Sequence, residues 1–296
     1  MFKVLWDVAT CPMTFDFATY LAMMDCYRQV NAPALDVAMT IRTGPFRTKT
    51  PRDQTMSEAE KRWRLKSIIM DMCELLPSIK TLRVTDQEPE EIDYPPKYKE
   101  FGFPYHAKHV LEAFHHGANP SVFRAPAYAK QMVAASRPYV TLTLRTSRHF
   151  QQRNVDLAAW YKFHQYLRAT GLDVLVVPDQ EDVLGGGAYK AFDWQAMLPA
   201  VFDLRLRFAL YEGALMNIGS ANGPVGVMFY SNAAVIQFDQ YRGNVLPETY
   251  WTKASGFPAG GQYPWCRPDQ RMAWKDSSYE NLVDEWRILG LPGGPG

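Results

Sequence analysis

The stretch FALYEGALMNIGSANGPVGVMFYSNAAVIQFD, residues 208–239, decides the fold of this chain. It contains an apolar run at 214–218, a turn of small residues at 219–223, a short helix from Pro224 and a second apolar run at 233–238. Proline suits the first position of a helix, and glycine lets the backbone approach a neighbour closely. This order of strand, turn, helix and strand predicts parallel strands joined by helical crossovers.

The same alternation continues on both sides of this stretch. In the C-terminal half we expect strands at 139–144 and 172–177 and helices at 156–170, 194–211 and 277–289. In the N-terminal half we expect strands at 2–6, 35–41 and 78–84, helices at 15–30 and 57–76, and a surface loop at 86–104. We therefore predict an α/β chain of two Rossmann-like domains facing a cleft, residues 1–125 and 126–296.

Composition narrows the class of protein. The 296 residues carry 32 Lys and Arg against 31 Asp and Glu, so no overall charge attracts nucleic acid or an anionic membrane. No run approaches the ~20 apolar residues of a membrane span, and the opening residues lack a secretory signal. The four cysteines are scattered, which favours reduced thiols. We expect a cytoplasmic protein.

Arginines follow the strand expected at 139–144. Arg145, Arg148 and Arg153 lie in the segment LTLRTSRHFQQRN, residues 142–154. Guanidinium groups match phosphate oxygens, and the carboxyl end of a parallel strand is where ligands bind, so these residues are candidate diphosphate ligands. The alternative is that they are ordinary surface arginines.

The turn at 219–224 is the second candidate site. Ser220, Asn222 and Gly223 precede a helix whose first amide groups can bind an anion. Alternatively, these residues serve the geometry of the turn alone. Glu212, just before the strand, is a candidate for accepting hydrogen bonds from ribose hydroxyls, or else a solvated charge at a helix end.

The run 208–239 resembles the C-terminal nucleotide-sugar-binding domain of GT-B glycosyltransferases, and within them the heptosyltransferase-like enzymes of bacterial cell-surface polysaccharide biosynthesis. Residues 139–154 are also similar to fucosyltransferase-like enzymes, in which a strand-end arginine grips the phosphate. The resemblance covers about residues 139–240. It departs at 220–222, where Ser-Ala-Asn replaces the usual Asp-Ser or Asn-Ser before Gly-Pro.

This resemblance implies a hexosyl- or heptosyltransferase that moves a sugar from a nucleotide-sugar donor to a glycan or lipid-linked acceptor, with no further cofactor. In an inverting enzyme of this fold, an N-domain carboxylate deprotonates the acceptor hydroxyl. Asp16 matches the loop-to-helix aspartate of the heptosyltransferase-like enzymes, and Asp7 at a strand end is the alternative. Asp16 is otherwise interpreted as a helix N-cap.

Two other interpretations stay open. A nucleotide-sugar epimerase uses the same fold, and so would a protein that binds nucleotide sugars without catalysis. A metal ion is not expected, because there is no Asp-x-Asp motif after a strand and the four histidines of 106–116 match no metal-binding motif.

Overall fold

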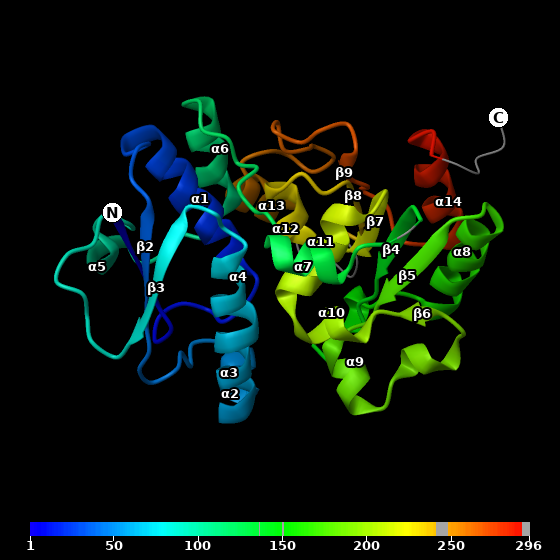
Figure 1. Ribbon diagram of the computed structural model, residues 1–296, viewed down its shortest axis with the longest axis horizontal. Helices are drawn as coiled ribbons and strands as arrows, with labels where there is room; N and C mark the ends of the chain where they lie inside the picture. Colours follow the sequence, from blue (N-terminus) through cyan, green and yellow to red (C-terminus); the bar gives the residue numbers. More distant parts are fainter. Residues whose placement is uncertain (136, 150, 241–247, 292–296) are drawn as a thin grey trace. The chain divides into compact units, whose positions relative to one another are not determined.

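The computed structural model describes residues 1–135, 137–149, 151–240 and 248–291. The chain divides into two compact units, an N-terminal unit of residues 1–124 with 254–256, and a C-terminal unit of residues 125–253 with 257–296. Each unit is built on a parallel sheet, as Figure 1 shows. The predicted α/β class with two Rossmann-like halves is therefore confirmed, whereas the predicted cleft between them stays a prediction.

The N-terminal unit holds a three-stranded sheet in the order β1-β2-β3. These strands are β1 (Phe2–Asp7), β2 (Val37–Arg42) and β3 (Ile79–Thr85), and their neighbours pair in parallel. The expected helix at 57–76 is one helical run of three segments, α3 (Glu58–Arg64), a π-helical turn (Leu65–Met70) and α4 (Asp71–Glu74). A short helix α2 (Pro51–Thr55) precedes it.

Helix α1 (Asp16–Asn31) packs on this sheet through an aromatic core. The ring of Trp6 lies 4.8 Å from that of Phe17 and 4.7 Å from that of Tyr20, centroid to centroid. The Tyr20 hydroxyl donates to the Leu5 carbonyl at 2.6 Å, so its polar end is satisfied inside the core. Burial of these rings fixes where α1 starts relative to the end of β1.

The segment expected to be a surface loop at 86–104 contributes to the fold. Tyr94 is buried, and its carbonyl accepts from the Leu5 amide at 3.0 Å, which extends the sheet beyond β1. Two helices follow, α5 (Tyr98–Phe101) and α6 (Ala107–His115). Most of 86–104 is a surface loop as predicted; the prediction missed the four-residue helix α5 and the buried ring of Tyr94, which the acidic, proline-rich composition hides.

The C-terminal unit holds a six-stranded parallel sheet in the order β6-β5-β4-β7-β8-β9. Its strands are β4 (Tyr139–Thr143), β5 (Asp173–Val177), β6 (Gln195–Ala196), β7 (Met216–Ser220), β8 (Val235–Phe238) and β9 (Gln270–Met272). The helices of this half of the chain are α7 (Ala127–Met132), α8 (Leu157–Ala169), α9 (Gln180–Gly185), α10 (Leu198–Phe202), α11 (Leu204–Gly213), α12 (Gly223–Val227), α13 (Glu248–Ser255) and α14 (Tyr279–Ile288).

One predicted element of this unit is wrong in detail. The expected helix at 194–211 is instead the short edge strand β6 followed by α10 and α11. The break falls at Asp203, whose carboxylate accepts from the Arg205 amide at 2.9 Å and caps the start of α11. Strand β9 was also missed, because three residues are too short a run for its pattern to be read.

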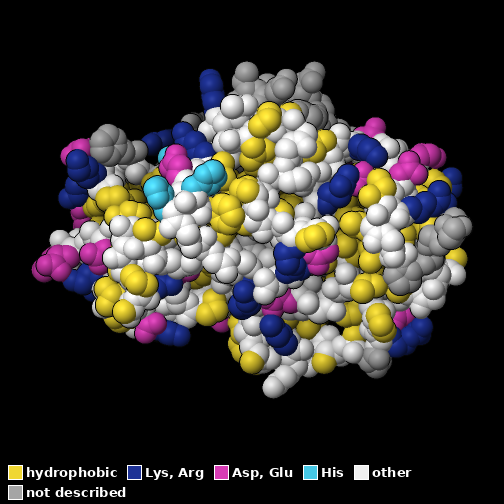
Figure 2. Space-filling view, turned by 90° about the horizontal axis from the view of Figure 1, so that it is seen from above, with side chains coloured by type: hydrophobic (Ala, Val, Ile, Leu, Met, Phe, Trp, Pro, Cys, Tyr) yellow, Lys and Arg dark blue, Asp and Glu magenta, His cyan; other side chains and the backbone are white. Residues whose placement is uncertain are grey.

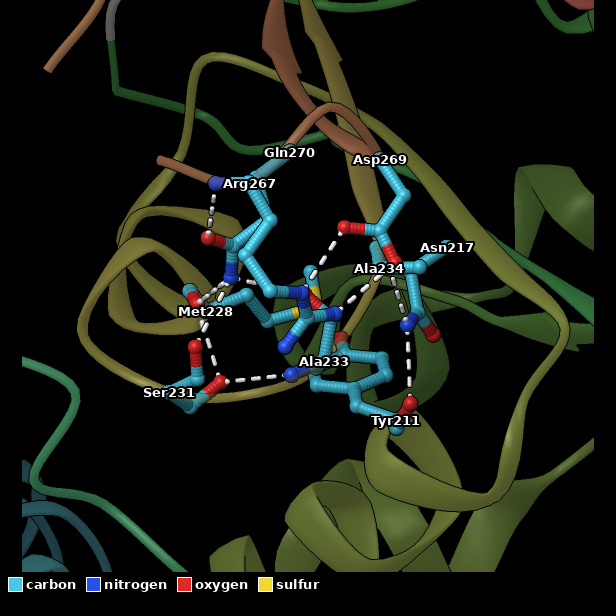
Figure 3. A network of polar contacts seen from close by, with 9 residues as sticks. All are labelled: Tyr211, Asn217, Met228, Ser231, Ala233, Ala234, Arg267, Asp269 and Gln270. Carbon is cyan, nitrogen blue, oxygen red and sulfur yellow. Dashed lines mark hydrogen bonds and ion pairs between the residues drawn. The ribbon is translucent and has the colours of Figure 1, made fainter. Parts of the chain in front are cut away.

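A polar network fastens the last strands of the sheet (Figure 3). The Gln270 side-chain amide donates to the carbonyls of Met228, Ser231 and Ala233 at 3.1, 2.8 and 3.0 Å. Asn217 donates to the carbonyl of Ala234 at 2.8 Å. These bonds hold the segment after α12 against β7, β8 and β9, and so position the turn at 219–224.

Candidate functional site

Four strands of the C-terminal sheet end side by side. In the register, Thr143 of β4 pairs with Val177 of β5 and with Gly219 of β7, and Gly219 pairs with Gln237 of β8. The loops that follow these strands therefore leave the same edge of the sheet. This carboxyl edge is where parallel α/β sheets bind ligands.

Arg145 follows β4 at this edge and is buried. Its guanidinium donates to the His149 carbonyl at 2.6 Å and to the Asn154 side chain, so it holds the loop at 145–154 in shape. Burial lowers the pKa of Arg145, and the neighbouring charge of Arg153 lowers it further. The carboxylates of Asp179 and Glu181 act in the opposite direction and raise it.

Arg148 is exposed on the same loop and is tied to α9. The Glu181 carboxylate accepts from the Arg148 amide at 2.8 Å and from the Ser147 hydroxyl at 3.0 Å. Burial raises the pKa of Glu181, but these hydrogen bonds together with the charges of His149 and Arg148 outweigh burial and lower it. From the sequence, Glu181 was considered only within the acidic run 179–182 after the expected strand, as the nearest approach to a metal-binding motif.

Arg153 connects the arginine loop to the turn after β7. Its guanidinium donates to the carbonyl of Ala221, in the middle of that turn. Ser220, the last residue of β7, is buried, and its hydroxyl has no hydrogen-bond partner in the part of the chain that the structure describes. Of the three candidate arginines, Arg153 contacts the turn at 219–224, whereas Arg145 and Arg148 bond within their own loop and to Glu181.

The amide groups of this turn are less available than the sequence suggests. The Asn222 side chain caps α12 by accepting from the Val225 amide at 3.1 Å, and the Gly226 amide donates to the Asn222 carbonyl at 3.1 Å. Pro224 has no amide hydrogen. Because the Val225 and Gly226 amides are used by Asn222 and Pro224 has none, the expectation of an amide-rich anion site is corrected to a site dominated by arginine.

Glu212 does not lie at this edge. It belongs to the last turn of α11, which leads into the start of β7, so it sits at the opposite, amino-terminal edge of the sheet. Its carboxylate pairs with Lys130 at 2.7 Å and accepts from the Ala125 amide at 3.1 Å. The prediction that Glu212 shares a ligand with the arginines was wrong, because a helix returning to a parallel sheet ends at the edge where the next strand begins.

Asp239 directly follows β8, at the same carboxyl edge of the sheet, and was not among the predicted site residues. It is buried and has φ +62°, a left-handed conformation uncommon outside glycine. Its carboxylate accepts from the Ser277 amide at 3.0 Å and the Ser277 hydroxyl at 2.7 Å. The rule that polar residues follow strands at the carboxyl edge would have selected it from the sequence.

The two candidate carboxylates of the N-terminal unit differ in their surroundings. Asp7 is buried at the end of β1, and its carboxylate pairs with Arg42 at the end of β2. Asp16 is exposed in the first turn of α1, where it accepts from the Thr14 hydroxyl at 2.7 Å. The N-cap of α1 is Phe15, so Asp16 does not serve as the helix cap.

Exposed histidines line α6 in the same unit. Figure 2 shows histidine side chains gathered at the surface seen from above. His109 contacts Glu112 at 3.0 Å. Among the described residues, no three His, Cys, Asp or Glu side chains come together as a metal ion would require. In the same residues, no helix is long and apolar enough to cross a membrane.

Solved structures share this architecture, although no protein-family model and no curated protein matches the sequence. One is a glycosyl transferase family 9 protein from Veillonella parvula, at 7% identity and TM-score 0.50, with 97% of this chain and 96% of that chain covered. Another is the E. coli ADP-heptose LPS heptosyltransferase II, at 10% identity and TM-score 0.51, covering 98% and 97%. The chain therefore has the GT-B-like fold of these transferases along its full length.

Proposed function

We propose that this protein is a glycosyltransferase that moves a sugar from a nucleotide-sugar donor to a glycan or lipid-linked acceptor. The observation that carries the proposal is the contact of Arg153 with the Ala221 carbonyl. It joins the arginine loop after β4 to the turn after β7 at the carboxyl edge of the sheet. Similarity in fold to a heptosyltransferase and a family 9 transferase supports the same assignment.

The arginines would serve the departing diphosphate. As the bond between the sugar and the phosphate breaks, negative charge grows on the leaving oxygen, and a fixed cation stabilises it without reorganisation. Arg153 is half-buried, and a guanidinium has five N–H donors, so it can keep its bond to Ala221 and still contact phosphate. Arg145 would hold the loop that presents it.

Asp16 is the better candidate for the base that takes the acceptor proton. Its carboxylate is exposed, and in the described part of the chain no cation lies within ion-pair distance of it. The Asp7 carboxylate is buried against Arg42, which would have to move before a substrate reached it. A base must come within hydrogen-bond reach of the hydroxyl that it deprotonates.

A thermal-shift screen against nucleoside diphosphates and their sugars tests the proposal, because a ligand that binds the folded state raises the melting temperature. We expect stabilisation by at least one nucleotide sugar and its diphosphate, and none by the nucleoside alone. Incubation of the stabilising donor with candidate glycan acceptors then identifies the product. A rearranged donor without acceptor would indicate an epimerase, and binding without turnover for any acceptor would indicate a non-catalytic protein.

A further inference from the structure

Strand β3 (Ile79–Thr85, cyan in Figure 1) is an open edge of the N-terminal sheet. The strand order places β2 on one side of it, and within the described residues no strand lies on the other side. Residues 80–84 are all exposed, so no helix or loop covers this edge. An edge strand carries a row of backbone N–H and C=O groups without sheet partners, on which another strand can pair.

Two apolar side chains of β3 lie on the face of the sheet that forms the core. In the register, Leu82 pairs with Met39 and Val84 pairs with Ile41, and paired residues of neighbouring strands direct their side chains to the same face. Met39 and Ile41 are buried, yet Leu82 is 36% and Val84 is 42% exposed. The core that covers β2 does not extend over β3, so these two side chains remain in contact with water.

The charges along β3 favour one arrangement of an added strand. Lys80 lies near the start of β3, Arg83 lies near its middle, and Asp86 follows its end. All three are exposed. A parallel copy of β3 in register would set each cation beside its own counterpart, and like charges directly opposite are destabilising. An antiparallel copy brings the basic start of one strand toward the acidic end of the other, so the charge pattern suits a second copy of this chain.

We propose that β3 pairs with β3 of a second copy of this chain, antiparallel about a two-fold axis at Leu82. This axis sets Leu82 opposite Leu82 of the second copy and Arg83 opposite Thr81 of the second copy. An axis at Arg83 would instead oppose two guanidinium groups. Leu82 and Val84 of both copies then form one apolar cluster that continues the core of each sheet and leaves water.

The dimer formed in this way is closed but small. Because the pairing uses the same edge of both copies, no second β3 edge is left free for a third copy. The register of β2 with β3 shifts between Val37 and Ala38, so Lys80 is an extra residue near the start of β3. Such a bulge shortens the regular part of the strand, so the association should depend on protein concentration.

Sedimentation equilibrium of the full chain over a range of concentrations tests the proposal, with Val84→Lys and Val30→Lys as a matched pair. The two valines belong to the N-terminal unit and are 42% and 45% exposed, but Val30 lies at the end of α1. The wild type and Val30→Lys should dimerise equally. Val84→Lys should dimerise about tenfold more weakly or not at all, because pairing would bury an ammonium group among apolar side chains. A monomeric wild type, undiminished dimerisation of Val84→Lys, or an equal loss in Val30→Lys would overturn the proposal.

Oxidation of single-cysteine substitutions tests the register. Cysteines directly opposite each other on antiparallel strands lie near the separation that a disulfide needs, whereas diagonal ones lie too far apart. Leu82→Cys should therefore give a disulfide-linked dimer, and Arg83→Cys, whose counterpart is diagonal, should not. The four native cysteines are present in both variants and serve as a common background. Cross-linking of Arg83→Cys, or no cross-linking of Leu82→Cys, would contradict a two-fold axis at Leu82.

Discussion

Gly219→Ala tests how the turn after β7 is held in place. A Cβ at position 219 would lie 2.4 Å from the Cγ2 of Val225 in α12, whereas carbon atoms normally approach to about 3.5 Å or more. The backbone at Gly219 is not in the left-handed region, so the effect of the substitution is steric. Close-packed interiors cannot absorb a shift of about 1 Å without cost.

The expected loss is about 1–3 kcal/mol of unfolding free energy, typical of an overpacked core. Val225→Ala, which removes a fully buried side chain, should cost about 2 kcal/mol by itself. In the double variant the new methyl group occupies the space that valine leaves, so the two losses should not add. We expect a favourable coupling of at least 1 kcal/mol, within the usual range for residues in contact.

Equilibrium urea unfolding of the four proteins measures these values, with extrapolation to water. Gly226→Ala is the matched control, because it lies in the same helix and its Cβ would meet nothing within 4 Å. Alanine favours a helix over glycine, so this control should be neutral or more stable by up to about 1 kcal/mol. Additive losses in the double variant, to within about 0.5 kcal/mol, would refute the steric explanation.

Three further predictions concern the C-terminal unit. Burial and the nearby charge of Arg168 lower the pKa of His164 below its ordinary 6.5. Below pH 6.5 the unfolded state therefore binds a proton more readily than the folded state, and the melting temperature should fall. His164→Phe should remove this fall. Glu212→Gln should leave nucleotide affinity unchanged in calorimetry, since Glu212 lies at the opposite edge of the sheet. The Asp156 carboxylate caps α8 by accepting from the Ala158 amide at 2.9 Å. Asp156→Ala should therefore lower the unfolding free energy by about 1 kcal/mol, measured by urea unfolding.

Much of the fold could be predicted from local pattern. The apolar run expected at 214–218 is β7 at 216–220, and the small residues after it do form a turn into a helix that Asn222 caps. Parallel strands send their carboxyl ends to one edge, which is why the meeting of Arg153 with that turn could be foreseen. These features depend on the periodicity of apolar residues and on the direction of the strands, and both can be inferred from the sequence.

The remaining features depend on long-range register, which no local pattern carries. The pairing of Asp7 with Arg42 requires that β1 and β2 align residue by residue. The loss of the Val225 and Gly226 amides to Asn222 required knowing which backbone amides the side chain and the carbonyl of Asn222 would reach. The placement of Glu212 was deducible, because a helix between parallel strands must end at the amino edge.

The most direct test of the account is calorimetric titration of a stabilising nucleoside diphosphate into the wild type, Arg153→Gln and Arg168→Gln. Arg168→Gln is the control, because it removes the same positive charge from an exposed residue in the last turn of α8. Loss of a charge-assisted contact to phosphate costs about 1.5–3 kcal/mol, so Arg153→Gln should weaken binding by about 10- to 150-fold while Arg168→Gln binds like the wild type. Equal affinity in all three proteins would contradict a diphosphate site at the carboxyl edge of the C-terminal sheet.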